Sequence, residues 1–122
     1  MVVYSWNMVN LFNRTGDQMG SYFAYALCAS DVDGDGLDDL VIGAPLFTHY
    51  DNNEGKYETG RVYVIYQGSG VQKTKFREVT TLDGKNSKAR FGMALTSLGD
   101  VNKDGFGGTR PEFFLCFKNN NK

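Results

Sequence analysis

Asp31-Val-Asp-Gly-Asp-Gly-Leu-Asp-Asp39 is the stretch of sequence that decides how this chain folds. Its carboxylates stand at positions 1, 3, 5, 8 and 9, and its glycines stand at positions 4 and 6. Like charges this close repel one another, and a hard cation that takes about six to eight oxygen ligands removes the repulsion. The alternative is a solvated acidic turn without a metal. We predict a calcium site whose ligands are the carboxylates of Asp31, Asp33, Asp35 and Asp39 and the carbonyl of Leu37.

The flanks of this loop indicate strands. An EF-hand requires a helix on each side and a glutamate at position 12, but position 12 here is Ile42. The apolar run Leu40–Pro45 ends in glycine and proline, as a buried strand does, and Tyr22–Cys28 is rich in aromatic residues. We therefore exclude an EF-hand and predict an antiparallel pair of strands at 22–28 and 38–43.

An imperfect second copy of the loop, Asp100-Val-Asn-Lys-Asp-Gly-Phe106, begins 69 positions after the first (100 − 31). Each copy follows a similar segment, Ser21–Leu27 in one case and Arg90–Leu95 in the other, which indicates a repeat architecture. Position 9 of the second copy is Gly108, so a ligand carboxylate is missing. We predict a weak or incomplete second calcium site at Asp100, Asn102, Asp104 and Phe106.

These motifs together resemble the FG-GAP repeat of integrin α subunits. The resemblance covers about residues 2–106 and rests on four segments in the order that the family shows: Asp17–Phe23, Asp31–Leu46, Gly60–Tyr63 and Arg90–Gly92. It implies an all-β fold, namely an incomplete β-propeller similar to the fifth blade and the start of the sixth of a seven-bladed propeller. It is closest to α subunits without an inserted I domain.

The resemblance also implies how the chain is divided. The expected parts are the end of a preceding blade with a linker (1–16), a complete blade with the calcium loop (17–82), the start of the next blade (83–106) and a divergent tail (107–122). The loss of pattern after Phe106 leads us to expect an altered or truncated gene product in preference to a divergent natural terminus. Phe23-Ala24 replaces the usual Phe-Gly, and we expect Ala24 to be tolerated with a negative φ.

Within the blade the expected strands are 22–28, 38–43, 61–66 and 73–80, which is the four-strand order of a propeller blade. An earlier strand at 2–6 is assigned to the preceding blade. Thr48–Thr59 is expected to be an exposed, mobile loop, and Leu82–Gly84 to turn the chain into the next repeat. Strand 61–66 is apolar on both faces. Because neighbouring blades are missing, we expect those faces to be exposed and the isolated chain to be marginally stable.

The function that the resemblance implies is cell adhesion. The parent would be a cell-surface receptor that pairs with an integrin β subunit and binds extracellular-matrix proteins, with Ca²⁺ in a structural role. One alternative is an FG-GAP enzyme such as a glycosylphosphatidylinositol-specific phospholipase, and another is a product without independent function. His49 is the only histidine, and the common catalytic motifs are missing from the sequence, so we predict no enzymatic activity.

The remaining features are less specific. The net charge of −1 gives no reason to expect nucleic acid as a partner, and Lys73, Lys75 and Arg77 fit a protected edge strand better than a nucleic-acid surface. No apolar run approaches the ~20 residues of a membrane span, and the N-terminus lacks the pattern of a signal peptide. Asn13-Arg-Thr15 is an N-glycosylation sequon. Of the two cysteines, Cys28 reads as a small core residue, and no pairing with Cys116 is predicted.

Overall fold

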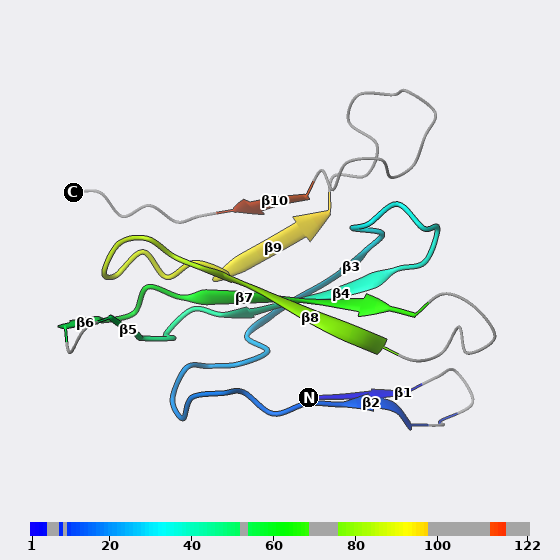
Figure 1. Ribbon diagram of the computed structural model, residues 1–122, viewed down its shortest axis with the longest axis horizontal. Helices are drawn as coiled ribbons and strands as arrows, with labels where there is room; N and C mark the ends of the chain where they lie inside the picture. Colours follow the sequence, from blue (N-terminus) through cyan, green and yellow to red (C-terminus); the bar gives the residue numbers. More distant parts are fainter. Residues whose placement is uncertain (5–7, 9, 52–53, 69–75, 98–112, 117–122) are drawn as a thin grey trace.

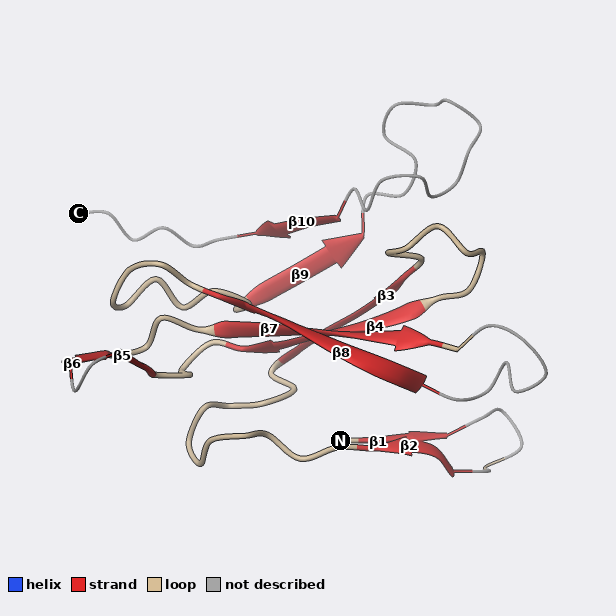
Figure 2. Ribbon diagram, viewed as in Figure 1, coloured by secondary structure: helices blue, strands red, loops and turns tan. Residues whose placement is uncertain are grey.

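The computed structural model describes residues 1–4, 8, 10–51, 54–68, 76–97 and 113–116. Within these ranges the chain forms ten β-strands and no helix (Figure 2). The predicted all-β class is therefore confirmed. In the same part of the chain there is no helix long and apolar enough to cross a membrane.

The centre of the fold is a four-stranded antiparallel sheet in the order β3-β4-β7-β8 (Figure 1). Its strands are β3 (Ala26–Ser30), β4 (Asp39–Ala44), β7 (Arg61–Gln67) and β8 (Phe76–Asp83). The four strands pair in the order in which they follow one another along the chain, with the short hairpin 49–56 inserted between β4 and β7, as predicted for one propeller blade. Strand β8 runs on through Asp83, so the chain turns at Gly84, later than the sequence suggested.

The first half of the predicted strand 22–28 is wrong, because residues 22–25 form a tight turn. The Tyr25 N–H donates to the Tyr22 carbonyl at 3.1 Å. Tyr22 and Ala24 have φ values of 55° and 67°. The expectation that Ala24 has a negative φ is therefore wrong as well. The left-handed conformation at position 24 is the physical reason that a glycine suits this place, since a Cβ atom is strained there.

Two further pairs of strands lie on opposite sides of the central sheet (Figure 1). Strands β1 (Val2–Tyr4) and β2 (Asn10–Asn13) form an antiparallel hairpin on one side, and β9 (Ala94–Ser97) pairs antiparallel with β10 (Phe113–Cys116) on the other. The sequence predicted neither a strand at 10–13 nor one in the tail after Phe106. The second calcium loop, 100–106, lies outside the described residues.

These flanking pairs cover strand β7 on both faces. Val62, Tyr63, Val64 and Ile65 are each between 0% and 2% exposed. Tyr63 and Ile65 belong to a cluster that reaches Met1 and Phe12 in the first hairpin, whereas Val62 and Val64 belong to a cluster that reaches Phe91 and Leu95. The expectation that strand 61–66 exposes its apolar faces is therefore wrong, because pieces of the two adjoining repeats bury it.

The predicted exposed loop at 48–59 is instead built around a short hairpin of β5 (His49–Asp51) and β6 (Glu54–Lys56). Its base is fixed by Gln18, whose side-chain amide both donates to the Thr48 carbonyl at 3.1 Å and accepts from the Thr48 N–H at 2.8 Å. This hairpin lies at the end of the central sheet opposite the acidic loop (Figure 1).

The two repeats share an unusual backbone conformation with an offset of 68 residues. Positive φ values recur at Gly20 (76°) and Lys88 (61°), at Tyr22 (55°) and Arg90 (51°), and at Ala24 (67°) and Gly92 (83°). The second of these turns is docked on the first repeat, because the Phe91 N–H donates to the Thr59 carbonyl at 3.0 Å and Gly60 forms a bridge with Phe91. The structural repeat therefore begins before the acidic loop, at the glycine-rich turn.

Candidate metal centre

The acidic loop folds around the side chain of Asp31. Its Oδ1 accepts the N–H groups of Gly34 at 2.7 Å and Asp35 at 3.2 Å, and its Oδ2 accepts that of Gly36 at 2.8 Å. Gly34 and Gly36 have φ values of 80° and 82°, which is why glycines stand at these two positions. A single carboxylate thus fixes the turn that joins β3 to β4.

Asp39 connects this loop to the sheet. It is the first residue of β4 and is fully buried. Its Oδ2 accepts the Val32 N–H at 2.8 Å, and its Oδ1 accepts the Gln67 N–H at the end of β7 at 2.9 Å. Burial raises the pKa of Asp39, the two backbone N–H groups oppose that rise, and the charges of Asp33 and Asp35 add to it. Asp39 therefore holds together the loop and two strands.

The structure brings three of the predicted ligands together. One carboxylate oxygen from each of Asp31, Asp33 and Asp39 lies within 4.8 Å of the others. Asp35 lies outside this group, and its Oδ1 accepts the Leu37 N–H at 2.8 Å. The donor set is made only of oxygen atoms, which suits hard cations such as Ca²⁺ and Mg²⁺ and not the softer metals that prefer nitrogen or sulfur.

The electrostatics of the group fit a cation. Three carboxylates at this separation repel one another, and one of them, Asp39, is buried, where an uncompensated negative charge is most costly. The backbone N–H groups that donate to Asp31 and Asp39 offset part of that cost. A divalent ion bound between Asp31, Asp33 and Asp39 would offset the remainder and would fix the hairpin between β3 and β4.

A second polar cluster lies at the opposite end of the central sheet. Arg61 donates to Asp83 through Nε at 2.5 Å and through Nη2 at 2.7 Å, and its guanidinium lies 3.8 Å from the ring centre of Phe47. The hydrogen bonds from Arg61 hold the pKa of Asp83 below its usual range, and they raise that of Arg61. The sequence did not predict this pair, because the two residues are 22 positions apart and no motif links them.

His49 and Cys28, the histidine and the cysteine that stand out in the sequence, both make contacts that belong to the packing of the fold. The His49 Nδ1 lies 3.1 Å from the Asp83 carboxylate, which links the β5–β6 hairpin to the end of β8. Cys28 is a half-buried free thiol that packs against the cluster around Val41, and burial raises its pKa. Asn13, the sequon residue, is exposed at the end of β2.

Comparison with known proteins identifies the family. The FG-GAP repeat matches residues 23–65, a range that begins at the Phe-Ala turn and contains the whole acidic loop. Integrin alpha-PS2 of Drosophila melanogaster is 58% identical over 107 residues, which are 88% of this chain and 8% of that protein. This chain belongs to the integrin α-subunit family.

Other integrin α subunits agree with this assignment. Integrin alpha-5 of Xenopus laevis is 45% identical over 97 residues (80% of this chain, 9% of that protein). Integrin alpha-8 of Homo sapiens is 41% identical over 105 residues (86% of this chain, 10% of that protein). The chain thus spans a tenth or less of the length of these curated relatives. The arrangement of strands around β7 is consistent with a fragment of a propeller built from FG-GAP repeats.

Proposed function

We propose that this chain is a calcium-stabilised segment of an integrin α-subunit propeller that serves cell adhesion. The observation that carries the proposal is the position of Asp39, which contacts the acidic loop and the end of β7 while it shares a cluster with Asp31 and Asp33. A cation in this cluster would act on three strands of one blade at once. Its role would be structural, and no reacting group is required.

The ligand set of the site is part of the proposal. Asp31, Asp33 and Asp39 supply the clustered carboxylates, and we propose that Asp35 and the Leu37 carbonyl complete the shell when Ca²⁺ binds. Asp35 is exposed, and the hydrogen bond that its carboxylate accepts comes from the Leu37 backbone N–H. A rotation of this side chain toward the cation therefore displaces no packed neighbour. The second site, at Asp100, Asn102, Asp104 and Phe106, stays a prediction from sequence.

The cellular setting follows from the family. We propose that the parent protein is a cell-surface receptor of the type without an inserted I domain, that it pairs with an integrin β subunit, and that it binds extracellular-matrix proteins. The proposed division of the chain is the end of one blade (1–16), a complete blade (17–82), the start of the next (83–106) and a tail (107–122). The two flanking pairs of strands in Figure 1 support this division, since they cover the central sheet as adjoining blades would.

Calorimetric titration of the chain with Ca²⁺ tests the metal proposal. We expect Asp31→Ala, Asp33→Ala and Asp39→Asn to weaken binding strongly, and Asp38→Asn to leave it nearly unchanged. Asp38 is the matched control because it is an exposed neighbour of Asp39 that lies outside the cluster. If Asp38→Asn and Asp39→Asn bind Ca²⁺ equally well, the assignment of the ligands is wrong.

The adhesion proposal needs the whole receptor. Asp39→Asn and Asp38→Asn are each placed in the intact parent subunit, which is co-expressed with a β subunit. The amount of heterodimer on the cell surface is measured by flow cytometry. We expect Asp39→Asn to lower the surface level and Asp38→Asn to leave it unchanged. Equal surface levels and equal adhesion for the two variants would contradict a role for this site in the receptor.

A further inference from the structure

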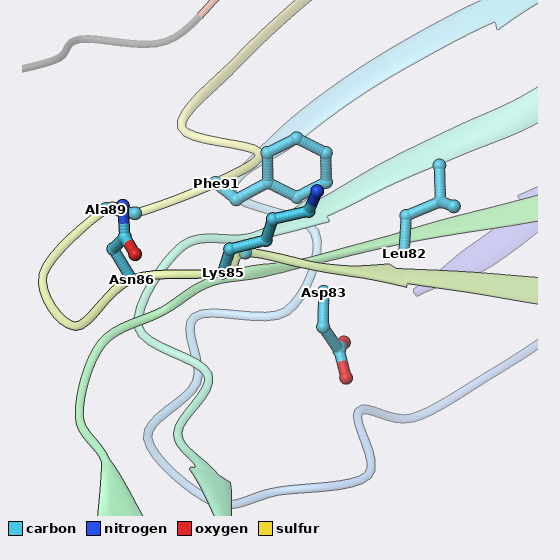
Figure 3. Close-up of a pocket in the computed structure, with 7 residues that line it drawn as sticks. Leu82, Asp83, Lys85, Asn86, Ala89 and Phe91 are labelled. Carbon is cyan, nitrogen blue, oxygen red and sulfur yellow. The ribbon is translucent and has the colours of Figure 1, made fainter.

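The β5–β6 hairpin lies at the end of the central sheet opposite the metal loop (Figure 1), and among the described residues its two strands pair only with each other. Its base is tied to β8, since the His49 Nδ1 lies 3.1 Å from the Asp83 carboxylate, which points away from Lys85 and Phe91 in Figure 3. A two-stranded hairpin of this kind is marginally stable by itself. Strand β5 can therefore open from β6 and leave the central sheet intact.

Tyr50, the middle residue of β5, presents a free hydroxyl group. It is 67% exposed, whereas Tyr63 in the central sheet is 0% exposed. Tyr50 lies opposite Gly55 in β6, and its ring stays close to the backbone there, because a Cβ atom at Gly55 would lie 3.3 Å from the Tyr50 Cε1. Among the described residues, no group forms a hydrogen bond with the Tyr50 hydroxyl. The phenolic oxygen is thus open to a reagent that approaches from solvent.

The sequence around Tyr50 is more acidic than that around any other of the seven tyrosines. Within five residues on either side stand Asp51 and Glu54 and no lysine or arginine, for a net charge of −2. The same window around Tyr57 holds two acidic and two basic residues, for a net charge of zero. The local charge therefore separates two tyrosines of the same hairpin.

Tyr57 differs from Tyr50 in its backbone as well. It is 63% exposed, so exposure to solvent does not distinguish the two residues. The Tyr57 carbonyl accepts the Lys88 N–H at 2.8 Å, which fixes its backbone to the turn of the second repeat. The backbone of Tyr50, among the described residues, pairs only within the hairpin. Tyr57 is therefore a matched comparison with a neutral surrounding and a tethered backbone.

We propose that Tyr50 is a site of O-sulfation by a tyrosine sulfotransferase of the secretory pathway. Under the proposed cell-surface function the chain passes through the compartment where such an enzyme acts, and the assignment rests on that function. The sulfonate donor is a nucleoside phosphosulfate, which carries several negative charges. A cleft that binds this donor is positively charged, and it attracts an acidic segment of the acceptor protein.

The transfer adds one sulfonate group to the side chain. The Tyr50 phenolic oxygen forms a bond to the sulfur of the donor while the bond from that sulfur to the bridging phosphate oxygen breaks. The nucleoside bisphosphate leaves with the electron pair, and a base of the transferase takes the phenolic proton. The product places a permanent negative charge on the exposed face of the hairpin, where it can accept charge-assisted hydrogen bonds from a partner's arginine or lysine.

Sulfation of the full 122-residue chain in vitro tests the site itself. The chain is produced in bacteria and incubated with a purified tyrosine sulfotransferase and a nucleoside phosphosulfate that carries radioactive sulfur. We expect the wild type to be labelled, Tyr50→Phe to lose nearly all of the label, and Tyr57→Phe to retain it. Both phenylalanine variants keep the aromatic ring, so the hairpin is preserved.

A second pair of variants tests the role of charge. Asp51→Asn should slow the labelling of Tyr50 by about two- to fivefold, because one exposed charge pair contributes little. Asp38→Asn removes one exposed carboxylate at the opposite end of the sheet, and it should leave the rate unchanged. The assignment is overturned if the wild type takes no label, if Tyr50→Phe is labelled as strongly as the wild type, or if the two phenylalanine variants lose the same share of the label.

The intact receptor supplies the cellular measurement. The heterodimer is purified from the cell surface, and the peptide that contains Tyr50 is analysed by mass spectrometry. We expect a sulfonate group that acid removes and a phosphatase does not. An unmodified Tyr50, or a group that the phosphatase removes, would overturn the assignment. The reaction in vitro does not depend on the cellular setting, so its failure excludes the sulfation site alone, whereas a labelled chain whose parent never reaches the surface would contradict the proposed function.

Discussion

Gly92→Ala tests whether the turn of the second repeat is docked on the central sheet. Gly92 has a φ of 83°, and a Cβ atom built there would lie 2.8 Å from the Val62 Cγ2, 3.1 Å from the Arg61 carbonyl oxygen and 3.1 Å from the Gly43 Cα. Two of these three neighbours are backbone atoms, which cannot move without disturbing the pairing of β4 and β7. The substitution therefore adds steric crowding to conformational strain.

Gly20→Ala supplies the matched control. Gly20 has a similar φ of 76°, but a Cβ atom there would meet no atom within 4 Å. Alanine in the left-handed region costs about 1–2 kcal/mol, and the loss of glycine's freedom in the unfolded chain returns about 0.4–1 kcal/mol. We expect Gly20→Ala to lower the free energy of unfolding by about 1 kcal/mol. Crowding adds about 1–3 kcal/mol at Gly92, for a total of about 2–4 kcal/mol.

Urea unfolding of the full chain, followed by far-ultraviolet circular dichroism, measures both values. The difference between the two variants isolates the contact between the second repeat and the first, because the conformational cost is common to both. We expect Gly92→Ala to be the less stable variant by about 1–3 kcal/mol. If the two variants lose the same stability, the turn around Gly92 is not packed on the central sheet in solution, and our explanation for the burial of β7 is wrong.

Three further predictions concern the same fold. Ala24→Gly should raise the free energy of unfolding by about 0.5–1 kcal/mol in the same urea assay, because Ala24 has a strained φ of 67°. A loss of stability would show that the partly buried methyl group of Ala24 contributes more than the backbone strain costs. Asp83→Asn should cost about 1–3 kcal/mol at neutral pH. Arg61 lowers the folded-state pKa of Asp83, so the stability that the ion pair contributes is complete above the unfolded-state pKa and is lost as the pH falls through the folded-state pKa. The cost of Asp83→Asn should therefore shrink in acid. A cost that does not depend on pH would exclude the ion pair as its source. Expression in a secretory host should attach a glycan to exposed Asn13, seen as a mass shift that peptide N-glycosidase removes. Asn13→Gln and Thr15→Ala should both abolish this mass shift. A mass shift that persists in both variants would place the glycan elsewhere.

The sequence predicted the parts of the fold that local patterns encode. The turn at the acidic loop, a strand on either side of it and the strand order of the central blade all follow from charge, apolar runs and turn residues. The structure confirms them, except that the strand before the loop begins only at Ala26. It brings Asp31, Asp33 and Asp39 together, although Asp35 lies apart from them. The geometry of the loop depends on residues close together in the sequence, so the spacing of its aspartates and glycines was enough to predict it.

What the sequence could not predict depends on contacts between distant segments. The aromatic residues at 22–25 resemble a strand, but the backbone turns there, as it does again at 90–93 in the second repeat. The burial of β7 requires segments from both ends of the chain, which no local pattern specifies. Strand β10 lies where the repeat motif is lost, so no motif indicated its pairing with β9.

Unfolding of the chain with and without Ca²⁺ tests the central claim most directly, namely that a cation at Asp31, Asp33 and Asp39 stabilises the blade. At a free Ca²⁺ concentration 100 times the dissociation constant, we expect the free energy of unfolding to exceed the value in a calcium chelator by about 2.7 kcal/mol. Asp39→Asn should remove this difference, and Asp38→Asn should retain it. Equal stability of the native chain with Ca²⁺ and with the chelator would contradict the claim.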